Sequence, residues 1–324
     1  MSHSRTARRA LAISLAALFT ASLAACSSVD DTSSDGRLEV AAAFYPIDEI
    51  AQRVGGALVD VVSLVPPGSE AHEFEPTPQQ LADLENADVV FYLADFQPNL
   101  EKVIESLPAS VQKVNLLDGI TMRQIGSNLP GTDDGDHEEE GDHEEAAAGS
   151  DDPHVWLDPA NMRTMTATVA RVLGAASASD AAAFEANAAT YTAELDTLDD
   201  TFAAGLAQCD SDVLVTGHQA FGYLADAYGL TQVAIAGISP GEEPSAQTLE
   251  AIAEFASAND VTTIFFEENL PDDLARTLAD EIGASTAVLS TLESLSSDQL
   301  DDGATYISVM EENLATLCAS LGCR

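Results

Sequence analysis

The sequence predicts an α/β protein made of two β/α lobes with parallel-type sheets, which one long helix joins. Short apolar segments alternate with helical segments in both halves of the chain, a pattern typical of parallel sheets covered by helices. A stretch of helix-forming residues, Asp180–Leu206, contains no proline and no glycine before Gly205. The 324 residues, 46% of them hydrophobic, are enough for two domains with a large core.

The first 25 residues have the pattern of a bacterial lipoprotein signal peptide. An arginine-rich start precedes an apolar run from Ala10 to Leu23, which is too short to span a bilayer. The run ends in Leu-Ala-Ala-Cys, so Cys26 is expected to carry the lipid and to become the new N-terminus. Residues 26–36 are polar and suit a flexible tether. We therefore expect a folded domain anchored by lipid to the outer face of the cell membrane.

The N-terminal lobe is expected over residues 37–178. Thr77 and Pro78 favour the start of a helix, since threonine is a good N-cap and proline fits the first helical turn. Strands are predicted at Leu38–Phe44, Val59–Val65, Val89–Leu93 and Gln112–Leu116, and helices at Pro46–Val54 and Gln79–Leu84.

A connecting helix is expected over residues 179–208, followed by a C-terminal lobe over residues 209–324. Twenty-five helical residues extend about 38 Å, long enough to run along both lobes. In the C-terminal lobe, strands are predicted at Val213–Thr216, Gln232–Ile238, Thr262–Phe266 and Thr286–Leu289, and helices at Gln219–Tyr228, Ser245–Ala258, Leu274–Ile282 and Tyr306–Leu321.

The strongly acidic composition excludes nucleic acid as a partner. The chain has 55 Asp and Glu against 12 Lys and Arg, and its formal net charge is −43. Binding to phosphates requires a basic surface, which this composition cannot provide. The charge favours cationic ligands, although any single carboxylate in such a chain is most often a solvated surface group.

Three of the six histidines lie where parallel sheets bind their ligands, at the carboxyl ends of strands or in the adjoining loops. Prolines stiffen the loop around His72, and His218 follows the strand Val213–Thr216. His154 lies in a loop in which Asp158 is positioned to hold its imidazole. A lone histidine is usually a surface or core residue, but three at equivalent positions favour a metal cluster.

Three neutral imidazoles with one carboxylate suit Zn²⁺, whose bonds to imidazole nitrogen are about 2.0–2.1 Å long. Mn²⁺ prefers more oxygen ligands and is the less favoured ion. Three glutamates follow strands of the C-terminal lobe and are candidates for the carboxylate: Glu267, Glu268 and Glu293. Their spacing does not choose among them.

Residues 128–149 form an acidic insertion in the N-terminal lobe. The part from Thr132 to Glu145 contains nine carboxylates together with His137 and His143, a composition that cannot bury a core. This insertion is an accessory metal loop that collects cations weakly near the cleft, or it is a solvated segment without such a role.

Three cysteines remain after Cys26, and the expected compartment is oxidising, so a disulfide is expected. We favour the pair Cys209 and Cys323. The pair Cys209 and Cys318 is the alternative, and the sequence does not decide between them.

Several motifs together resemble the metal-binding lipoproteins of bacterial zinc and manganese ABC importers, the cluster A-I substrate-binding proteins. These motifs are PPGSEAHEFEPTP, DPHVWLDP, TGHQAFGYLADAYGL, GISPGEEPS, FFEENL and YISVMEENLATL. The resemblance covers nearly all of the chain after the signal peptide. It implies a rigid connecting helix, a metal site in the cleft between the lobes, and a lipid-anchored monomer that captures Zn²⁺ for an ABC permease and its ATPase.

The resemblance also assigns the ligands. It implies that His72, His154 and His218 bind the metal, and the third position favours zinc because manganese members usually carry glutamate there. A glutamate in a segment like Pro-Leu-Glu can supply the fourth ligand in zinc members, and Glu293 is the corresponding residue. Thr291 stands where the proline is usual, which leaves water or another carboxylate as alternatives for the fourth position.

Other functions are compatible with parts of this pattern. A manganese-binding member of the same family is one alternative, and an adhesin-like surface lipoprotein is another, since members of the family have been linked to adhesion. A zinc hydrolase would need an open coordination position and a general base. The sequence has no HExxH motif, and a fourth protein ligand would close the shell, so we expect no enzymatic activity.

Overall fold

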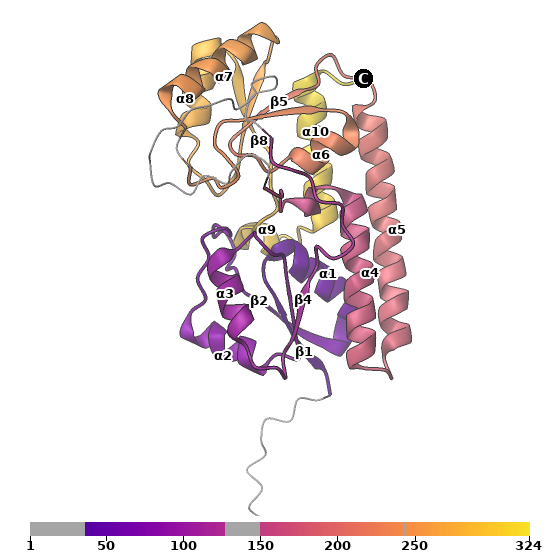
Figure 1. Ribbon diagram of the computed structural model, residues 1–324. Helices are drawn as coiled ribbons and strands as arrows, with labels where there is room; N and C mark the ends of the chain where they lie inside the picture. Colours follow the sequence, from indigo (N-terminus) through magenta and orange to yellow (C-terminus); the bar gives the residue numbers. More distant parts are fainter. Residues whose placement is uncertain (1–35, 127–149, 243) are drawn as a thin grey trace, which may run out of the picture. The chain divides into compact units, whose positions relative to one another are not determined.

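The computed structural model describes residues 36–126, 150–242 and 244–324. Residues Arg37–Arg324 form one compact unit, whose fold is shown in Figure 1. Cys26 and the two histidines of the acidic insertion, His137 and His143, lie outside the described residues. In the described ranges, no helix is both long and apolar enough for a membrane span.

The first lobe contains a four-stranded parallel sheet with the strand order β2-β1-β3-β4. Its central strands are buried and apolar, as expected for a sheet that helices cover on both faces. The strands are β1 (Leu38–Ala42), β2 (Val59–Ser63), β3 (Val89–Tyr92) and β4 (Gln112–Asn115). The helices are α1 (Tyr45–Gly55), the short 3-10 turn η1 (Gly56–Leu58), α2 (Pro78–Asn86) and α3 (Pro98–Ser106).

The second lobe repeats this arrangement, because its parallel sheet has the equivalent order β6-β5-β7-β8. The strands are β5 (Val213–Thr216), β6 (Thr231–Ala234), β7 (Thr263–Phe266) and β8 (Ser285–Val288). The helices are α6 (Gly222–Tyr228), α7 (Ala246–Ala258) and α8 (Asp273–Ile282). The predicted fold class, two β/α lobes with parallel sheets, is confirmed.

A long helix runs along both lobes. Helix α5 (Ala181–Leu206) agrees with the predicted Asp180–Leu206, and its 26 residues correspond to about 39 Å. It packs against α1 in the first lobe, against α6 in the second, and against α4 (Pro159–Ala176) beside it. Figure 1 shows α5 passing from the level of the first sheet to that of the second. We propose that residues 179–208 connect an N-terminal lobe, residues 37–178, to a C-terminal lobe, residues 209–324.

The last helix, α10 (Tyr306–Leu321), belongs to the same hydrophobic core as the first lobe and α5. The hydroxyl of Tyr306 donates to the backbone oxygen of Trp156 at 2.6 Å. Trp156 lies in the 3-10 turn η2 (Val155–Leu157) and is fully buried against Phe44 and Phe96. This core therefore connects the end of the chain to the segment that carries His154.

Helix α3, in the first lobe, and a short helix before α10 were not predicted from the sequence. The apolar residues Leu100, Val103 and Ile104 do have helical spacing in α3, so this helix could have been predicted. Helix α9 (Ser297–Asp301) has only five residues, too few for a recognisable apolar repeat.

Candidate metal centre

The first candidate ligand, His72, lies in the loop after β2. The carboxylate of Glu70 accepts hydrogen bonds from the backbone N–H groups of His72 and Glu73, at 2.6 and 2.9 Å, and so fixes the turn that carries the imidazole. The ring of Phe96 lies edge-on to the His72 ring, with 4.6 Å between the centroids. The histidine is buried, so these neighbours set its orientation.

The His72 loop is attached to the loop after β8. The backbone N–H of Gly68 donates both to Ser294 Oγ, at 2.8 Å, and to Leu295 O, at 2.9 Å. Gly68 has a φ of +73°, a left-handed conformation that glycine adopts without strain. These bonds join the first-lobe loop that carries His72 to the second-lobe loop that carries Glu293.

The second candidate, His154, is fully buried just before η2. Oδ1 of Asp152 lies 3.0 Å from its backbone nitrogen and 2.9 Å from its Nδ1. When Nδ1 donates to this carboxylate, the lone pair on Nε2 is available for a metal. The predicted role of Asp158 as the partner of His154 is wrong. Asp158 instead caps α4, and its Oδ1 accepts from the backbone N–H of Ala160 at 2.8 Å.

Asp152 is in turn held by basic and hydroxyl groups. Its Oδ2 lies 3.3 Å from Nη1 of Arg123, and Nε of Arg123 lies 3.0 Å from Oδ2 of Asp226 in α6. The hydroxyl of Tyr223 accepts from the backbone N–H of Arg123 at 2.8 Å and donates to the backbone oxygen of Asp152 at 3.0 Å. This network connects His154 to α6 of the second lobe.

The third candidate, His218, lies two residues after the end of β5 and is fully buried. Its Nδ1 lies 3.0 Å from Oε1 of Glu267, a residue of the loop after β7. Its backbone oxygen accepts from Thr216 Oγ1 at 2.8 Å and from Gln232 Nε2 at 3.0 Å. Gly217 leaves room for the carboxylate, because a Cβ at that position would lie 2.7 Å from Glu267 Oε1. The carboxylate of Glu267 therefore contacts the Nδ1 side of the His218 ring.

The fourth candidate, Glu293, lies in a buried loop after β8 that other elements hold on two sides. The indole N–H of Trp156 donates to the backbone oxygen of Thr291 at 2.7 Å. Asn313 of α10 accepts from the backbone N–H of Ser290 and donates to its backbone oxygen, both at 2.8 Å. Glu268, the remaining candidate, is exposed, and it accepts a hydrogen bond from Gln299.

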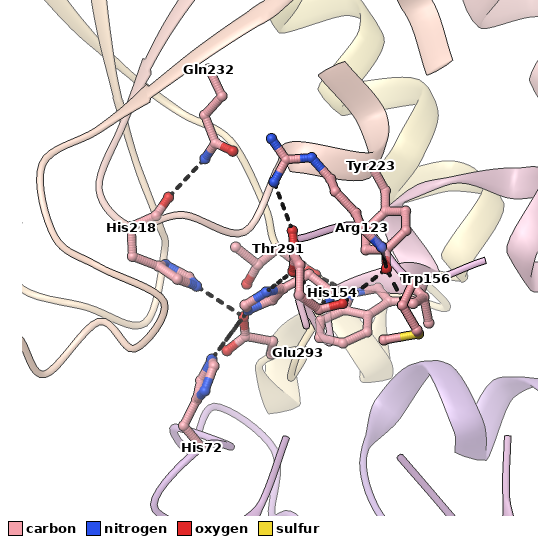
Figure 2. Close-up of polar contacts among 12 residues, drawn as sticks. His72, Arg123, His154, Trp156, His218, Tyr223, Gln232, Thr291 and Glu293 are labelled. Carbon is pink, nitrogen blue, oxygen red and sulfur yellow. Dashed lines mark hydrogen bonds and ion pairs between the residues drawn. The ribbon is translucent and has the colours of Figure 1, made fainter. Parts of the chain in front are cut away.

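The four side chains converge on one point, as Figure 2 shows. Oε1 of Glu293 lies 3.6 Å from Nε2 of His72, 3.7 Å from Nε2 of His154 and 3.4 Å from Nε2 of His218. One ligand atom from each residue lies within 4.8 Å of the other three. Neighbouring donors in a tetrahedral zinc shell are about 3.3–3.4 Å apart, given bonds of about 2.0–2.1 Å. The cluster is therefore close to the size that such a shell requires.

Three buried atoms of this cluster lack hydrogen-bond partners among the described residues: Nδ1 and Nε2 of His218 and Oε1 of Glu293. Nδ1 faces the carboxylate of Glu267, whereas Nε2 of His218 and Oε1 of Glu293 face the centre of the cluster. Buried polar groups without a partner are costly and uncommon in folded proteins. A cation bound between the four side chains would satisfy the two atoms that face the centre, so the donor set fits a divalent transition-metal ion.

Burial and charge act in opposite directions on the pKa values of the cluster. Burial lowers the pKa of His154 and keeps it neutral near pH 7. Burial would also lower the pKa of His218, but Glu267 and Glu293 outweigh it and raise the pKa to about 10. Burial would raise the pKa of Glu293, but His72 and His218 hold it well below its usual range. Without a metal, His218 is therefore an imidazolium that must lose its proton before it can bind a cation.

The cysteines are arranged as the favoured pairing predicts. Cys209, which follows α5, is joined to Cys323, which follows α10, and Cys318 is a free, half-buried thiol.

Asp152 and Arg123, which support His154, were not predicted from the sequence. A carboxylate two residues before a candidate ligand histidine was the available signal for Asp152.

Three imidazoles and one carboxylate thus meet in one buried cluster of a protein with two β/α lobes, and this donor set could hold a metal ion. Residues 40–320 match the ZnuA family, described as "Zinc-uptake complex component A periplasmic", and the chain belongs to this family.

The chain is 39% identical over 313 residues to the zinc-binding lipoprotein AdcA of Streptococcus pneumoniae strain R6, a match that covers 95% of this chain and 59% of that protein. It thus spans only about three fifths of the length of this curated relative. It is 35% identical over 289 residues to the high-affinity zinc uptake system protein ZnuA of Bacillus subtilis, with 88% of each chain covered. The crystal structure of the Zn(II)-bound ZnuA-like domain of S. pneumoniae AdcA matches with a TM-score of 0.72 and 35% identity, covering 88% of this chain and 99% of that one.

Proposed function

We propose that this chain captures a single Zn²⁺ ion with His72, His154, His218 and Glu293 and delivers it to an ABC permease and its ATPase. The observation that carries the proposal is the position of Glu293 Oε1, 3.4–3.7 Å from the Nε2 atoms of all three histidines. Relatives of this chain are named for zinc binding and zinc uptake. Three nitrogen donors with one oxygen favour Zn²⁺ over Mn²⁺, which prefers more oxygen ligands.

We also propose that the chain acts outside the cytoplasmic membrane as a monomer, anchored by lipid on Cys26. Binding rather than catalysis fits the donor set, because four protein ligands complete a tetrahedral shell and leave no position for a substrate.

The acidic insertion, with His137 and His143, is proposed as an accessory loop that binds cations weakly.

Calorimetric titration of the metal-free chain starting at Ser27, which contains the whole unit Arg37–Arg324, tests the proposal. We expect one tight site for Zn²⁺ and much weaker binding of Mn²⁺. Equal or tighter binding of Mn²⁺ would favour the manganese alternative. The lack of a tight site for either ion would refute metal capture.

Replacing Asp152 with Asn is expected to weaken zinc binding by about 10- to 100-fold, the usual cost of losing a partner that orients a ligating histidine. The carboxylate is fully buried and faces Nδ1 of His154. The matched control is Asp226→Asn, which removes the exposed partner of Arg123 on the other side and is expected to change the affinity less than about threefold. Competition with a zinc chelator measures both variants, and equal affinities would contradict the role of Asp152.

Zinc binding is expected to release about one proton from His218 near pH 7.5, because the pKa of this imidazole is raised to about 10 and a ligating histidine must be neutral. The zinc association constant should therefore rise about tenfold per pH unit below pH 10, and fall as the solution is acidified. Calorimetry in two buffers with different heats of ionisation measures the proton release. A binding heat that is the same in both buffers would contradict this prediction.

A further inference from the structure

The four candidate ligands are almost completely enclosed, so a cation needs a route to them. Each is at most 8% exposed. A small cavity of about 20 Å³ adjoins the cluster, because Glu293 forms part of its wall. This volume accommodates about one water molecule or one ion.

The cavity lies between loops of both lobes and is lined by carboxylates. The loop after β2 contributes Ser69 and Glu70, and the loop after β7 contributes Glu267 and Glu268. Glu267 and Glu293 are buried, whereas Glu268 is exposed. Among the described residues that line the cavity, none is basic. The lining therefore leads from an exposed acid to two buried acids next to the cluster.

The carboxylate of Glu267, which lines this cavity, lacks hydrogen-bond partners in the part of the chain that the structure describes. Glu267 is only 5% exposed, and neither oxygen of its carboxylate has a hydrogen-bond partner among the described residues. Oε1 faces His218 Nδ1 at 3.0 Å. A buried carboxylate oxygen without a partner is costly, and a cation in the adjoining cavity would offset that cost.

We propose that this cavity is a transient site for a divalent cation on its way to the four-ligand centre, an inference that rests on the proposed function. The ion exchanges part of its hydration shell for the carboxylates of Glu70, Glu267 and Glu268. It then passes to two imidazoles. His72 lies in the same loop as Glu70, and His218 faces Glu267. Oxygen ligands bind Zn²⁺ less tightly than imidazoles do, so the ion moves from weaker to stronger donors.

The test compares Glu268→Gln with Glu254→Gln in the chain starting at Ser27. Both changes remove one exposed negative charge, but Glu254 lies on α7 and does not line the cavity. Stopped-flow mixing with Zn²⁺ gives the association rate constant, and transfer of bound zinc to an excess of chelator gives the dissociation rate constant. A residue that stabilises the ion in passage lowers both rates and leaves their ratio nearly unchanged.

We expect Glu268→Gln to lower both rate constants about three- to tenfold, with the dissociation constant changed less than about twofold, and the loss to shrink at high salt. Glu254→Gln should leave both rates unchanged. Equal rates in the two variants, or a faster dissociation with an unchanged association rate in Glu268→Gln, would overturn the transient site while leaving zinc capture intact. A failure of the unsubstituted chain to bind zinc tightly would overturn both proposals.

Discussion

Replacing His218 with Ala is expected to weaken zinc binding by about 100- to 1,000-fold. Structural zinc sites bind with about 10–16 kcal/mol, and an equal share for each of four ligands is about 2.5–4 kcal/mol. His218 is fully buried, and its Nε2 lies 3.4 Å from Glu293 Oε1, so solvent cannot easily supply a replacement in the same position. The variant also removes the imidazole whose Nδ1 lies 3.0 Å from Oε1 of Glu267.

The control for this prediction is His143→Ala, which removes a histidine of the acidic insertion instead. Competition against a chelator of known affinity should show the full tight site in His143→Ala and its loss in His218→Ala. Circular dichroism and thermal unfolding without metal separate a loss of ligand from a loss of fold. A tight site that survives in His218→Ala would contradict the proposed ligand set.

Removing the disulfide between Cys209 and Cys323 is expected to lower the free energy of unfolding of the chain strongly. Cys209 and Cys323 are 114 residues apart in the sequence, and the loop between them contains the whole second sheet. In the chain-entropy model, closing a loop of this length stabilises a protein by at most about 4–5 kcal/mol, since it restricts the unfolded chain. We therefore expect the double variant Cys209→Ser with Cys323→Ser to unfold at a much lower denaturant concentration.

The control is Cys318→Ser, which removes the free thiol and leaves the disulfide in place. Cys318 packs at the edge of the core, and its Sγ makes a weak hydrogen bond to Gly205 O at 3.5 Å, so we expect the free energy of unfolding to change by less than about 1 kcal/mol in this variant. Denaturation in urea at equal protein concentration compares the variants. If the double variant and Cys318→Ser unfold at the same midpoint, the disulfide does not stabilise the fold as stated.

The elements with strong periodic patterns were predictable from the sequence. The alternation of apolar and helical segments predicts both sheets, and the long stretch without proline predicts α5 to within one residue. Short elements such as α9 were not predicted, because five residues do not display a repeat. The positions of His72, His154 and His218 at strand ends or in loops were also readable, because parallel strands bring their carboxyl ends to one edge of a sheet.

The roles of the carboxylates were harder to predict, because they depend on side-chain directions that spacing does not contain. Glu267 and Glu268 are adjacent in the sequence, yet Glu267 is buried beside His218 and Glu268 is exposed. Asp152 and Asp158 flank His154 at two and four residues. Only Asp152 reaches the imidazole, since Asp158 is used to cap α4. Glu293 was distinguished by the family resemblance rather than by its position.

We propose that three histidines and Glu293 hold one zinc ion. Anomalous diffraction at the zinc edge, from crystals of the chain starting at Ser27 loaded with one equivalent of Zn²⁺, tests this ligand set. We expect one strong peak about 2.0–2.2 Å from Nε2 of His72, His154 and His218 and from a carboxylate oxygen of Glu293. A peak at other residues, or only weak peaks at surface carboxylates, would contradict it.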